Sequence, residues 1–413
     1  MSKKVNKNMP VLRFPEFQGD WKDKILAEAS QIQTGPFGSQ LKNEQYITGG
    51  TPVVTVEHIK NFYIDNFDYP SVTNLDRERL KKYTLNSGDL VFSRVGSVDL
   101  SACVEDHQEG WLFSSRMLRV RPNQKLKPKF LAYFLQQTKV RRYIIRISVG
   151  STMPSLNTEI LQNLPIKYCS LEEQEKIASF LGAVDRRLTQ LRRKQELLQT
   201  YKRGVMQKIF SQEIRFKQDN GAFFPNWQET TLGKVANFSK GKGLPKEDLV
   251  ESGNLQCIRY AELYTLYDEV IDKVFSSTNV DPGNLILSLE NDVIIPASGE
   301  SAIEIAKAAC VKISGVALGG DLNIIKSSIN GEFLAYYLNH YRKKDIARVA
   351  QGNTVVHLYS SQLAQIEIEI PSQEEQKKIV KFLTMINQKI KAVSQQIDHT
   401  EEFKKGLLQK MFV

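Results

Sequence analysis

The sequence predicts a mixed α/β (α+β) protein made of two copies of a globular domain, separated by two long helices that form an antiparallel coiled coil. The first observation is an internal repeat about 202 residues long. The second is a sustained heptad pattern at the end of each repeat. The third is that short apolar runs bounded by Gly, Pro, Asn and Asp precede each heptad pattern, as strands do. Two near-equivalent domains in one chain imply a pseudo-two-fold, as in a dimer whose subunits have been joined.

The repeat consists of fragments that recur in one order. They are Phe130–Leu135 with Phe333–Leu338, Gly150–Thr152 with Gly352–Thr354, Glu172–Gln174 with Glu374–Gln376, and Gln207–Phe210 with Gln409–Phe412. Solenoid repeats are shorter, at most roughly 50 residues. Each copy is therefore expected to be a whole domain. The expected segments are a first domain at residues 1–169, a first helix at 170–211, a second domain at 212–371 and a second helix at 372–413.

Each long helix has a predicted start and a predicted core. Ser170 and Ser372 are followed three positions later by Glu173 and Glu375, which is the pattern of a capping box. Such long heptad patterns favour pairing of the two helices, although each helix could instead pack only on its own domain, and polar residues such as Lys202 and Lys404 interrupt the pattern. The expected helix core is Ile177, Leu181, Val184, Leu188, Leu191, Leu198, Ile379, Leu383, Ile386, Ile390, Val393 and Ile397.

Composition and charge limit the possible partners. The 413 residues include 56 Lys and Arg against 46 Asp and Glu, a formal net charge of +10, which favours nucleic acid first and an anionic membrane surface second. The 4 cysteines and 5 histidines are scattered, so neither a disulfide framework nor a metal site is expected. The sequence starts without a signal-peptide pattern and has no run of about 18 apolar residues. We therefore expect a soluble, cytoplasmic protein.

The sequence motifs do not indicate an enzyme. The sequence contains no G-x-x-x-x-G-K-[ST] phosphate loop, and Gly241–Gly243 is only a glycine–lysine turn. It also contains neither a glycine-rich methyl-donor loop nor an Asn-Pro-Pro-Tyr-like turn, and Ser298–Glu300 is not a nucleophile elbow. Binding is therefore the expected activity, with no catalytic residue and no cofactor held by this chain.

Several polar loops are candidates for contact with DNA. The turn that starts at Gly35 offers backbone N–H groups and a nearby cation to phosphate oxygens, although an ordinary glycine–proline turn is an equal alternative. Arg94 follows an apolar strand and could bind guanine or phosphate, or form a surface salt bridge. The turns at Gly150 and Gly352 recur in both copies, either because they contact DNA or because the packing beside the preceding helix requires them. The candidates are Gly35, Pro36, Phe37, Gly38, Ser39, Lys42, Ser93, Arg94, Ser97, Ser151, Thr152, Lys240, Lys242, Ser298, Asn353 and Thr354.

A set of fragments in this order resembles one known family. The fragments are Gly35–Ser39, Gly88–Gly96, Leu171–Ala178 and Glu374–Ile379, together with the helix ends Gln-Lys-Ile-Phe and Gln-Lys-Met-Phe. Over nearly its whole length the chain resembles the specificity subunit of a type I restriction–modification system. It departs from the family pattern at Cys169, where the second copy has Pro371. Ala297 also stands opposite Arg94, so the two domains need not both use an arginine there.

The resemblance implies a non-catalytic subunit that recognises a bipartite target in double-stranded DNA, one half per domain. Its helices would act as a spacer and dock two methyltransferase subunits, which would carry S-adenosylmethionine. Restriction or translocase subunits, with ATP and magnesium, could join the complex. Two alternatives stay open: a DNA methyltransferase or nuclease that acts on its own, and a coiled-coil scaffold that does not bind DNA.

Overall fold

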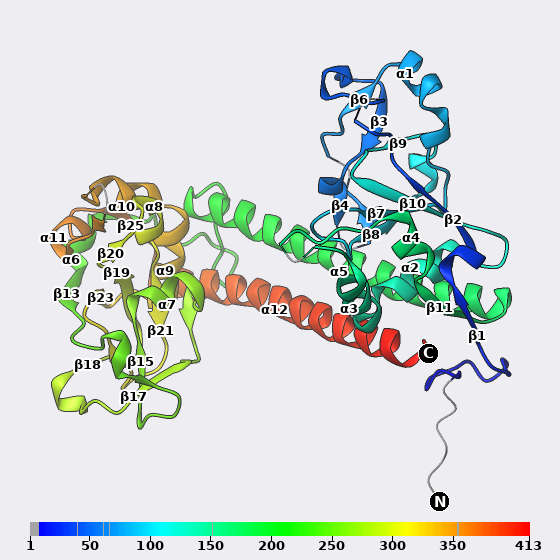
Figure 1. The fold of residues 1–413 in the computed structure, drawn as a ribbon. Coiled ribbons are helices and arrows are strands. Elements are labelled where there is room, and N and C mark those ends of the chain that lie inside the picture. The colour runs from blue at the N-terminus through cyan, green and yellow to red at the C-terminus, as the bar shows by residue number, and fades with distance from the viewer. Residues whose placement is uncertain (1–7, 39, 61, 66, 151, 353–354) are drawn as a thin grey trace, which may run out of the picture. The chain divides into compact units, whose positions relative to one another are not determined.

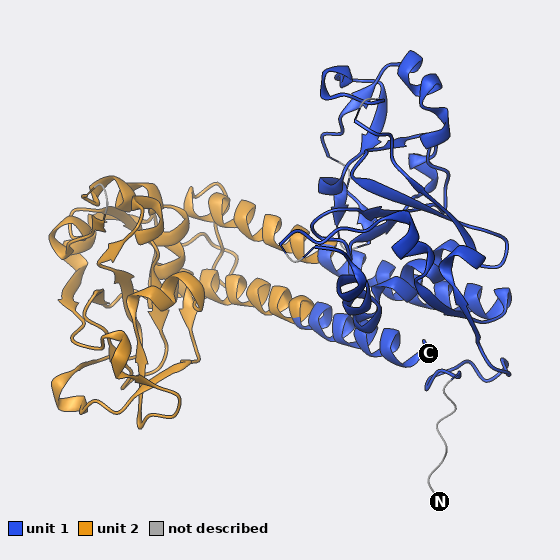
Figure 2. Cartoon of the chain, viewed as in Figure 1, with its two compact units in different colours: residues 1–192, 395–413 blue, residues 193–394 orange. Residues whose placement is uncertain are grey.

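The computed structural model describes residues 8–38, 40–60, 62–65, 67–150, 152–352 and 355–413. The chain divides into two compact units, blue and orange in Figure 2: unit 1 is Met1–Arg192 with Gln395–Val413, and unit 2 is Arg193–Ser394. Each unit holds a mixed α/β domain and parts of two long helices (Figure 1), which confirms the predicted fold class. Both long helices continue through the unit boundaries without a break.

The strands of unit 1 form a central sheet and several small ones. They are β1 (Lys22–Ile25), β2 (Ser30–Thr34), β3 (Thr51–Val54), β4 (Ile59–Lys60), β5 (Tyr63–Ile64), β6 (Ser71–Val72), β7 (Leu90–Ser93), β8 (Ser101–Cys103), β9 (Leu112–Phe113), β10 (Met117–Pro122) and β11 (Pro165–Tyr168). The central sheet has the order β2-β10-β7-β8. β10 is antiparallel to both neighbours, so Arg119 lies opposite Gln33 and Val91.

Unit 2 repeats this sheet and extends it. Its strands are β12 (Gln228–Thr231), β13 (Ala236–Lys240), β14 (Leu249–Val250), β15 (Leu255–Ile258), β16 (Val270–Ile271), β17 (Ser276–Thr278), β18 (Ile286–Leu287), β19 (Asp292–Pro296), β20 (Ser298–Gly299), β21 (Ala309–Val311), β22 (Ala317–Leu318), β23 (Leu322–Ser327), β24 (Val356–His357) and β25 (Glu367–Ile370). The order β13-β23-β19-β21 corresponds to β2-β10-β7-β8 in unit 1, with β16 added at the edge.

The helices follow the same repeat. They are α1 (Asn74–Arg79), α2 (Pro128–Gln136), α3 (Thr138–Ile147), α4 (Thr158–Gln162), α5 (Leu171–Phe210), α6 (Leu232–Val235), α7 (Tyr260–Thr265), α8 (Ala302–Ile305), α9 (Gly331–His340), α10 (Lys343–Val349), α11 (Ser360–Leu363) and α12 (Gln373–Lys410). The series α2 to α5 corresponds to α9 to α12, so the internal repeat seen in the sequence is a repeat of structure.

Both long helices begin at the predicted N-cap serine. The Ser170 hydroxyl accepts a hydrogen bond from the backbone N–H of Glu173 at 3.3 Å, and Ser372 accepts one from Glu375 at 3.3 Å. The glutamate carboxylates, however, are bound by an arginine that lies 160 positions earlier in each case. The predicted capping box is therefore correct for the serines, while the glutamate side chains hold the helices to their domains instead.

Within each unit the two long helices lie side by side and run antiparallel. In unit 1, Asp185 of α5 pairs with Lys404 of α12 at 2.8 Å. Further along α5, Arg192 pairs with Glu401, an earlier residue of α12, at 2.6 Å. In unit 2 the last turn of α5 and the first turns of α12 share one hydrophobic core. The predicted antiparallel pairing is confirmed inside each unit, and packing of each helix only on its own domain is excluded.

The expected helix core is buried along most of its length. Leu198 and Ile390 are half-buried, and the buried positions are Ile177, Leu181, Val184, Leu188, Leu191, Ile379, Leu383, Ile386, Val393 and Ile397. Lys404, which interrupts the heptad pattern, lies 5.6 Å from the ring centroid of Tyr133. Lys202 lies 5.4 Å from the ring centroid of Tyr336 and also binds Glu269. Both interruptions therefore have partners in the structure.

The phenylalanine that ends each repeat completes a domain core. The Phe412 ring centroid lies 5.2 Å from that of Phe130 and 6.0 Å from that of Trp21 in unit 1. Phe210 lies 6.0 Å from Phe333 in unit 2. The recurring helix-end motif is thus explained by burial of an aromatic side chain, and the core of unit 1 needs the last residues of the chain.

Candidate nucleic-acid interface

In unit 1, three loops that the sequence indicates meet at one end of the central sheet. Val95, just after β7, forms a bridge with Ser155 in the turn that follows Gly150. The N–H of Gly96 donates to the carbonyl of Pro154 at 2.9 Å. The end of β2 joins them, because Nη1 of Arg94 donates to Oγ1 of Thr34 at 3.3 Å. The tertiary structure thus brings together candidates that lie far apart in the sequence.

The glycine loop after β2 is held tightly by its backbone. Gly35 and Pro36 are buried, and the Gly35 N–H donates to the carbonyl of Met117 at 3.0 Å. The expectation that this N–H is open to phosphate is therefore wrong, because it belongs to the sheet ladder. A Cβ at Gly35 would lie 2.0 Å from a backbone carbonyl oxygen, so only glycine fits there.

Beyond Gly35 the loop becomes accessible. Phe37, Gly38 and Lys42 are exposed, Phe37 to 60%. Ser39 lies outside the described residues. Contact with a ligand from this loop would therefore come from its side chains and later backbone.

The other candidates of unit 1 differ in accessibility. Ser93 is fully buried and its hydroxyl donates to the carbonyl of Val95 at 3.0 Å. The expectation that Ser93 contacts DNA does not hold in this structure, because its hydroxyl shapes the turn. Ser97 and Thr152 are exposed, and Ser151 lies outside the described residues. The recurring glycine has a backbone reason, since Gly150 has φ 100° in a region that favours glycine.

Unit 2 repeats this frame with different side chains. Gly241 occupies the place of Gly35: its N–H donates to the carbonyl of Leu322 at 2.9 Å, and a Cβ would lie 2.0 Å from a carbonyl oxygen. The glycine loop has no close twin in the second copy of the sequence, where residues 239–243 occupy roughly its place, and the structure identifies Gly241 as the equivalent glycine. Lys240 and Lys242 flank it and are exposed. The Lys240 ammonium lies 5.7 Å from the ring centroid of Tyr359.

Among the other candidates of unit 2, the Ser298 hydroxyl already has a hydrogen-bond partner. Ser298 on β20 pairs with His357 on β24, and its hydroxyl donates to Oδ2 of Asp321 at 2.9 Å. Asn353 and Thr354 lie outside the described residues. The corresponding loops of the two units therefore present different chemistry from the same frame.

A hollow of about 490 Å³ opens beside the joined loops of unit 1. Its charged lining residues are Arg94, which is half-buried, and Arg116, which is exposed. Sequence reasoning missed Arg116, because nothing local marks it. Only the pairing of β7 with β10 would reveal Arg116, because it places this residue beside Arg94. The N–H of Arg94 donates to the carbonyl of Arg116 at 2.9 Å, where β7 ends and β10 begins.

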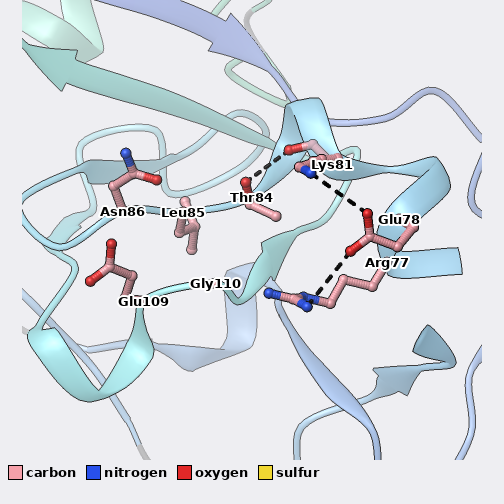
Figure 3. A pocket seen from close by; sticks show the side chains of 8 residues that line it. All are labelled: Arg77, Glu78, Lys81, Thr84, Leu85, Asn86, Glu109 and Gly110. Atoms are coloured by element: carbon pink, nitrogen blue, oxygen red, sulfur yellow. Dashed lines mark hydrogen bonds and ion pairs between the residues drawn. The ribbon is translucent and has the colours of Figure 1, made fainter. Parts of the chain in front are cut away.

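A second, smaller hollow of about 220 Å³ lies against α1 (Figure 3). Its cations face a carboxylate: Glu78 lies 3.8 Å from Arg77 and 3.7 Å from Lys81. Glu109 adds a further acid to its lining. Because its positive charge is already balanced, this hollow suits an anionic ligand less well than the one beside Arg94.

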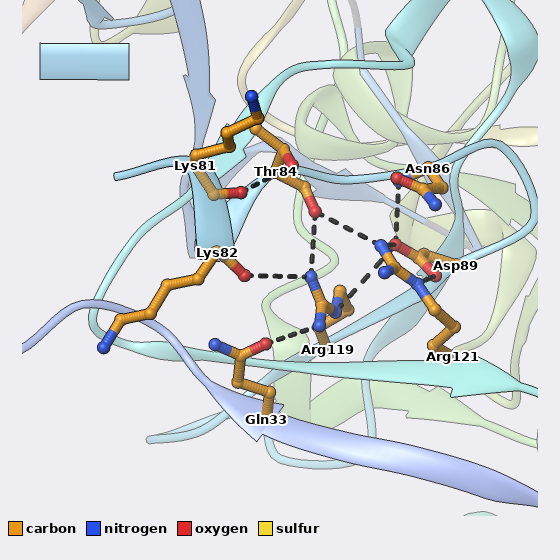
Figure 4. Close-up of polar contacts among 8 residues, drawn as sticks. All are labelled: Gln33, Lys81, Lys82, Thr84, Asn86, Asp89, Arg119 and Arg121. Atoms are coloured by element: carbon orange, nitrogen blue, oxygen red, sulfur yellow. Dashed lines mark hydrogen bonds and ion pairs between the residues drawn. The ribbon is translucent and has the colours of Figure 1, made fainter. Parts of the chain in front are cut away.

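A buried polar network holds the loop ahead of β7 to the central sheet (Figure 4). Asp89 binds Arg121 through both carboxylate oxygens at 2.7 Å. Arg119 donates to the backbone carbonyl of Thr84 at 2.8 Å and also to Oε1 of Gln33. Burial lowers the pKa of the Arg119 guanidinium. These arginines are used inside the domain and are distinct from Arg94 and Arg116.

Within residues 8–413, apart from the gaps given above, no group of His, Cys, Asp or Glu side chains is placed to hold a metal ion. Nor does any helix in those residues have the length and apolar character to cross a membrane. The four cysteines are free, and burial raises the pKa of the Cys257 thiol to about 11.

Residues 18–199 and 225–401 match the family model of the type I restriction modification DNA specificity domain. The chain belongs to this specificity-subunit family. It is 26% identical to a protein of Methanocaldococcus jannaschii assigned as the MjaX type I restriction enzyme specificity subunit, over 97% of this chain and 95% of the relative. It is 22% identical to the MjaVIII specificity subunit of the same organism, over 97% of this chain and 93% of the relative.

The fold of this specificity subunit is also found in solved structures. The S subunit of a type I restriction–modification system from M. genitalium superposes with a TM-score of 0.61 at 17% identity, covering 98% of this chain and 99% of the other. A chain from a study of assembly and conformational transition in the type I system gives 0.59 at 19% identity, covering 95% and 97%. The predicted family is thus confirmed, and the chain is a DNA-recognition subunit rather than an enzyme in its own right.

Proposed function

We propose that this specificity subunit recognises a bipartite target in double-stranded DNA, one half with each domain. The proposed functional division is a recognition domain at residues 1–169, a spacer helix at 170–211, a second recognition domain at 212–371 and a second spacer helix at 372–413. The helices would set the distance between the two half-sites. Two sites that read one duplex would have centres separated by about one turn, roughly 34–36 Å.

One observation carries this proposal: the two units share a backbone frame at the candidate interface but differ in the side chains on it. Gly35 and Gly241 are equivalent in the sheet ladder and in their close approach to a carbonyl. Around them unit 1 presents Arg94, whereas unit 2 presents Lys240 and Lys242. A scaffold kept twice with different surfaces suits recognition of two different DNA sequences.

The proposal assigns the chemistry to partners. Two methyltransferase subunits would dock on the helices and carry S-adenosylmethionine, and restriction or translocase subunits with ATP and magnesium would complete a larger assembly. The relatives named as type I restriction enzyme specificity subunits support this assignment. This chain would supply binding and orientation only.

Mapping methylated adenines in cells with and without this gene tests the proposal. We expect a two-part DNA motif with a gap of fixed length, which disappears when the gene is deleted. A single continuous motif, or methylation that is unchanged by the deletion, would contradict it. Methyl transfer or cleavage by the purified chain alone would instead support the alternative of an independent enzyme.

A salt titration separates DNA recognition from a purely scaffolding role. If the chain and its methyltransferase partner neutralise six to ten phosphates, affinity for DNA should fall about 10³- to 10⁵-fold between 50 and 200 mM salt. The comparison is the methyltransferase partner by itself. A scaffold that does not touch DNA would leave the salt dependence of the partner unchanged.

A further inference from the structure

The two units carry different charges at one equivalent position of the candidate interface. In unit 1 the N–H of Arg94 donates to the carbonyl of Arg116 at 2.9 Å. In unit 2 the N–H of Ala297 donates to the carbonyl of Asp321 at 2.8 Å. The first contact joins the residue after β7 to the residue before β10. The second joins the residue after β19 to the residue before β23, and these are the corresponding strands of unit 2. Two arginines in unit 1 thus replace an alanine and an aspartate in unit 2.

The fold itself does not require these arginines. Unit 2 builds the same strand pairing without them. The Arg94 guanidinium has a hydrogen bond to Thr34, and Arg116 is exposed. Among the residues that the structure describes, neither guanidinium lies within ion-pair distance of a carboxylate. In the described part of the chain, the two neighbouring arginines together make a single side-chain hydrogen bond, from Arg94 to Thr34, so they keep most of their donors available for a ligand with acceptor atoms.

The hollow between the two arginines has the walls of a site for a base edge. Its other lining residues are the polar Ser115, Ser155 and Asn157 and the apolar Val95, Val149, Leu156 and Ile160. Phosphate would be bound through charge and hydrogen bonds and would gain little from apolar walls. A nucleobase has both a row of acceptors and an apolar surface, and fits this lining better.

We propose that Arg94 and Arg116 read a guanine in the half-site recognised by unit 1, an inference that rests on the proposed function. Arginine donates two hydrogen bonds to O6 and N7 of guanine in the major groove, and this is the commonest specific contact between a side chain and a base. The exposed Arg116 makes the base contact. Arg94, tethered to Thr34, adds a second donor and limits the positions that the base can take.

Unit 2 excludes guanine at the equivalent position. Asp321 presents carboxylate oxygens there, one of which already accepts the Ser298 hydroxyl at 2.9 Å. Guanine offers only acceptors on this edge, so acceptors would face acceptors. The recognised target is therefore asymmetric at this position, because only unit 1 presents arginines there.

Adenine-methylation mapping with point variants tests this assignment in cells that express the complete complex. The variants are Arg116→Ala and Arg94→Lys, with Lys82→Ala as a control that removes one exposed positive charge elsewhere in unit 1. For Arg116→Ala we expect discrimination between guanine and other bases at one position of one half-site to fall about 10- to 100-fold. The other half-site and the gap should keep their sequence. Lys82→Ala should leave every position of the motif unchanged.

The outcomes separate this inference from the proposed function. A wild-type motif in two parts, with base preferences that Arg116→Ala leaves unchanged or weakens uniformly, would overturn the guanine assignment and leave the proposed function intact. A wild-type motif without guanine in either half would also overturn it. Absence of any two-part motif in the wild type would overturn both. Since Arg116 is exposed, Arg116→Ala is not expected to lose its fold. Thermal unfolding of Arg94→Lys checks separately that this variant is folded.

Discussion

Nη2 of Arg13 lies 2.7 Å from the buried carboxylate of Glu173, and Arg215 forms the same ion pair with Glu375 at 2.7 Å. In each copy the arginine precedes its glutamate by 160 positions. The hydrogen bond to Glu173 raises the pKa of the Arg13 guanidinium, whereas burial opposes this shift. The ion pair joins the start of each long helix to the start of the domain that it follows.

The residue after each glutamate makes a second repeated contact. Oε1 of Gln174 accepts the backbone N–H of Lys127 at 2.8 Å, and Oε1 of Gln376 accepts that of Asn330 at 2.8 Å. Both glutamines are buried. The recurring Glu-Glu-Gln motif is thus explained as a set of contacts that fixes each long helix to its own domain.

Removing the buried carboxylate should destabilise unit 1. Glu173→Gln removes the charge of the carboxylate that binds the Arg13 guanidinium, which is only 11% exposed. We expect the free energy of unfolding to fall by about 3–5 kcal/mol, measured by urea denaturation. The control is Glu196→Gln, which breaks an exposed pair with Arg193 and should cost at most about 1 kcal/mol. Equal effects of the two substitutions would contradict this role of the buried pair.

The C-terminal phenylalanine should stabilise the first domain although it is remote in sequence. Phe412→Ala removes a buried ring from the core shared with Phe130 and Trp21, which we expect to cost about 3–5 kcal/mol. Hydrogen exchange should then quicken in α2 of unit 1. Phe403→Ala is the matched control, because that ring is 54% exposed. Unchanged protection of α2 in Phe412→Ala would show that the ring is not needed there.

The acid stability of unit 2 should depend on Glu269. Burial would raise the pKa of the Glu269 carboxyl, but the hydrogen bond with His340 and the charge of Lys202 lower it from 4.5 to about 2. A carboxyl with a lowered folded pKa contributes stability that is fully present above about pH 4.5 and is lost as the pH falls toward about 2.

Glu269→Gln should therefore flatten the decline in stability across that pH window. Urea midpoints measured between pH 2 and pH 6 provide the test, with the exposed Glu251→Gln as control. Glu251→Gln should keep the wild-type dependence of the urea midpoint on pH. If Glu269→Gln keeps it as well, another group controls the acid transition of unit 2.

If the helices set the gap between half-sites, lengthening them should lengthen the gap. Inserting four residues into the middle of both α5 and α12 adds about 6 Å of helix. At about 3.4 Å per base pair along a strand, the gap in the methylated motif should grow by one or two base pairs. Substituting four residues in the same place without insertion is the control. A gap of unchanged length after the insertion would contradict the spacer role.

The sequence by itself determined the features that depend on local pattern. The repeat, the N-cap serines at Ser170 and Ser372 and the heptad cores can be predicted because helix starts and helix faces follow from residues a few positions apart. The family resemblance depended on the same recurring fragments. The second copy has Asn291 where the first has Gly88, and this difference also has a local explanation. Asn291 has φ 80° and Gly88 has φ 85°, and asparagine tolerates this region better than most residues.

Only the tertiary structure decided which distant groups meet. It assigned Glu173 to Arg13 and Lys404 to Asp185, gave Phe412 to the core of unit 1, and buried Ser93. It also placed Arg116 beside Arg94 through strand pairing. These outcomes depend on contacts between residues tens to hundreds of positions apart, whose formation is governed by the packing of whole sheets and helices. No short motif encodes such contacts, so side-chain roles at the interface could be assigned only after the fold was known.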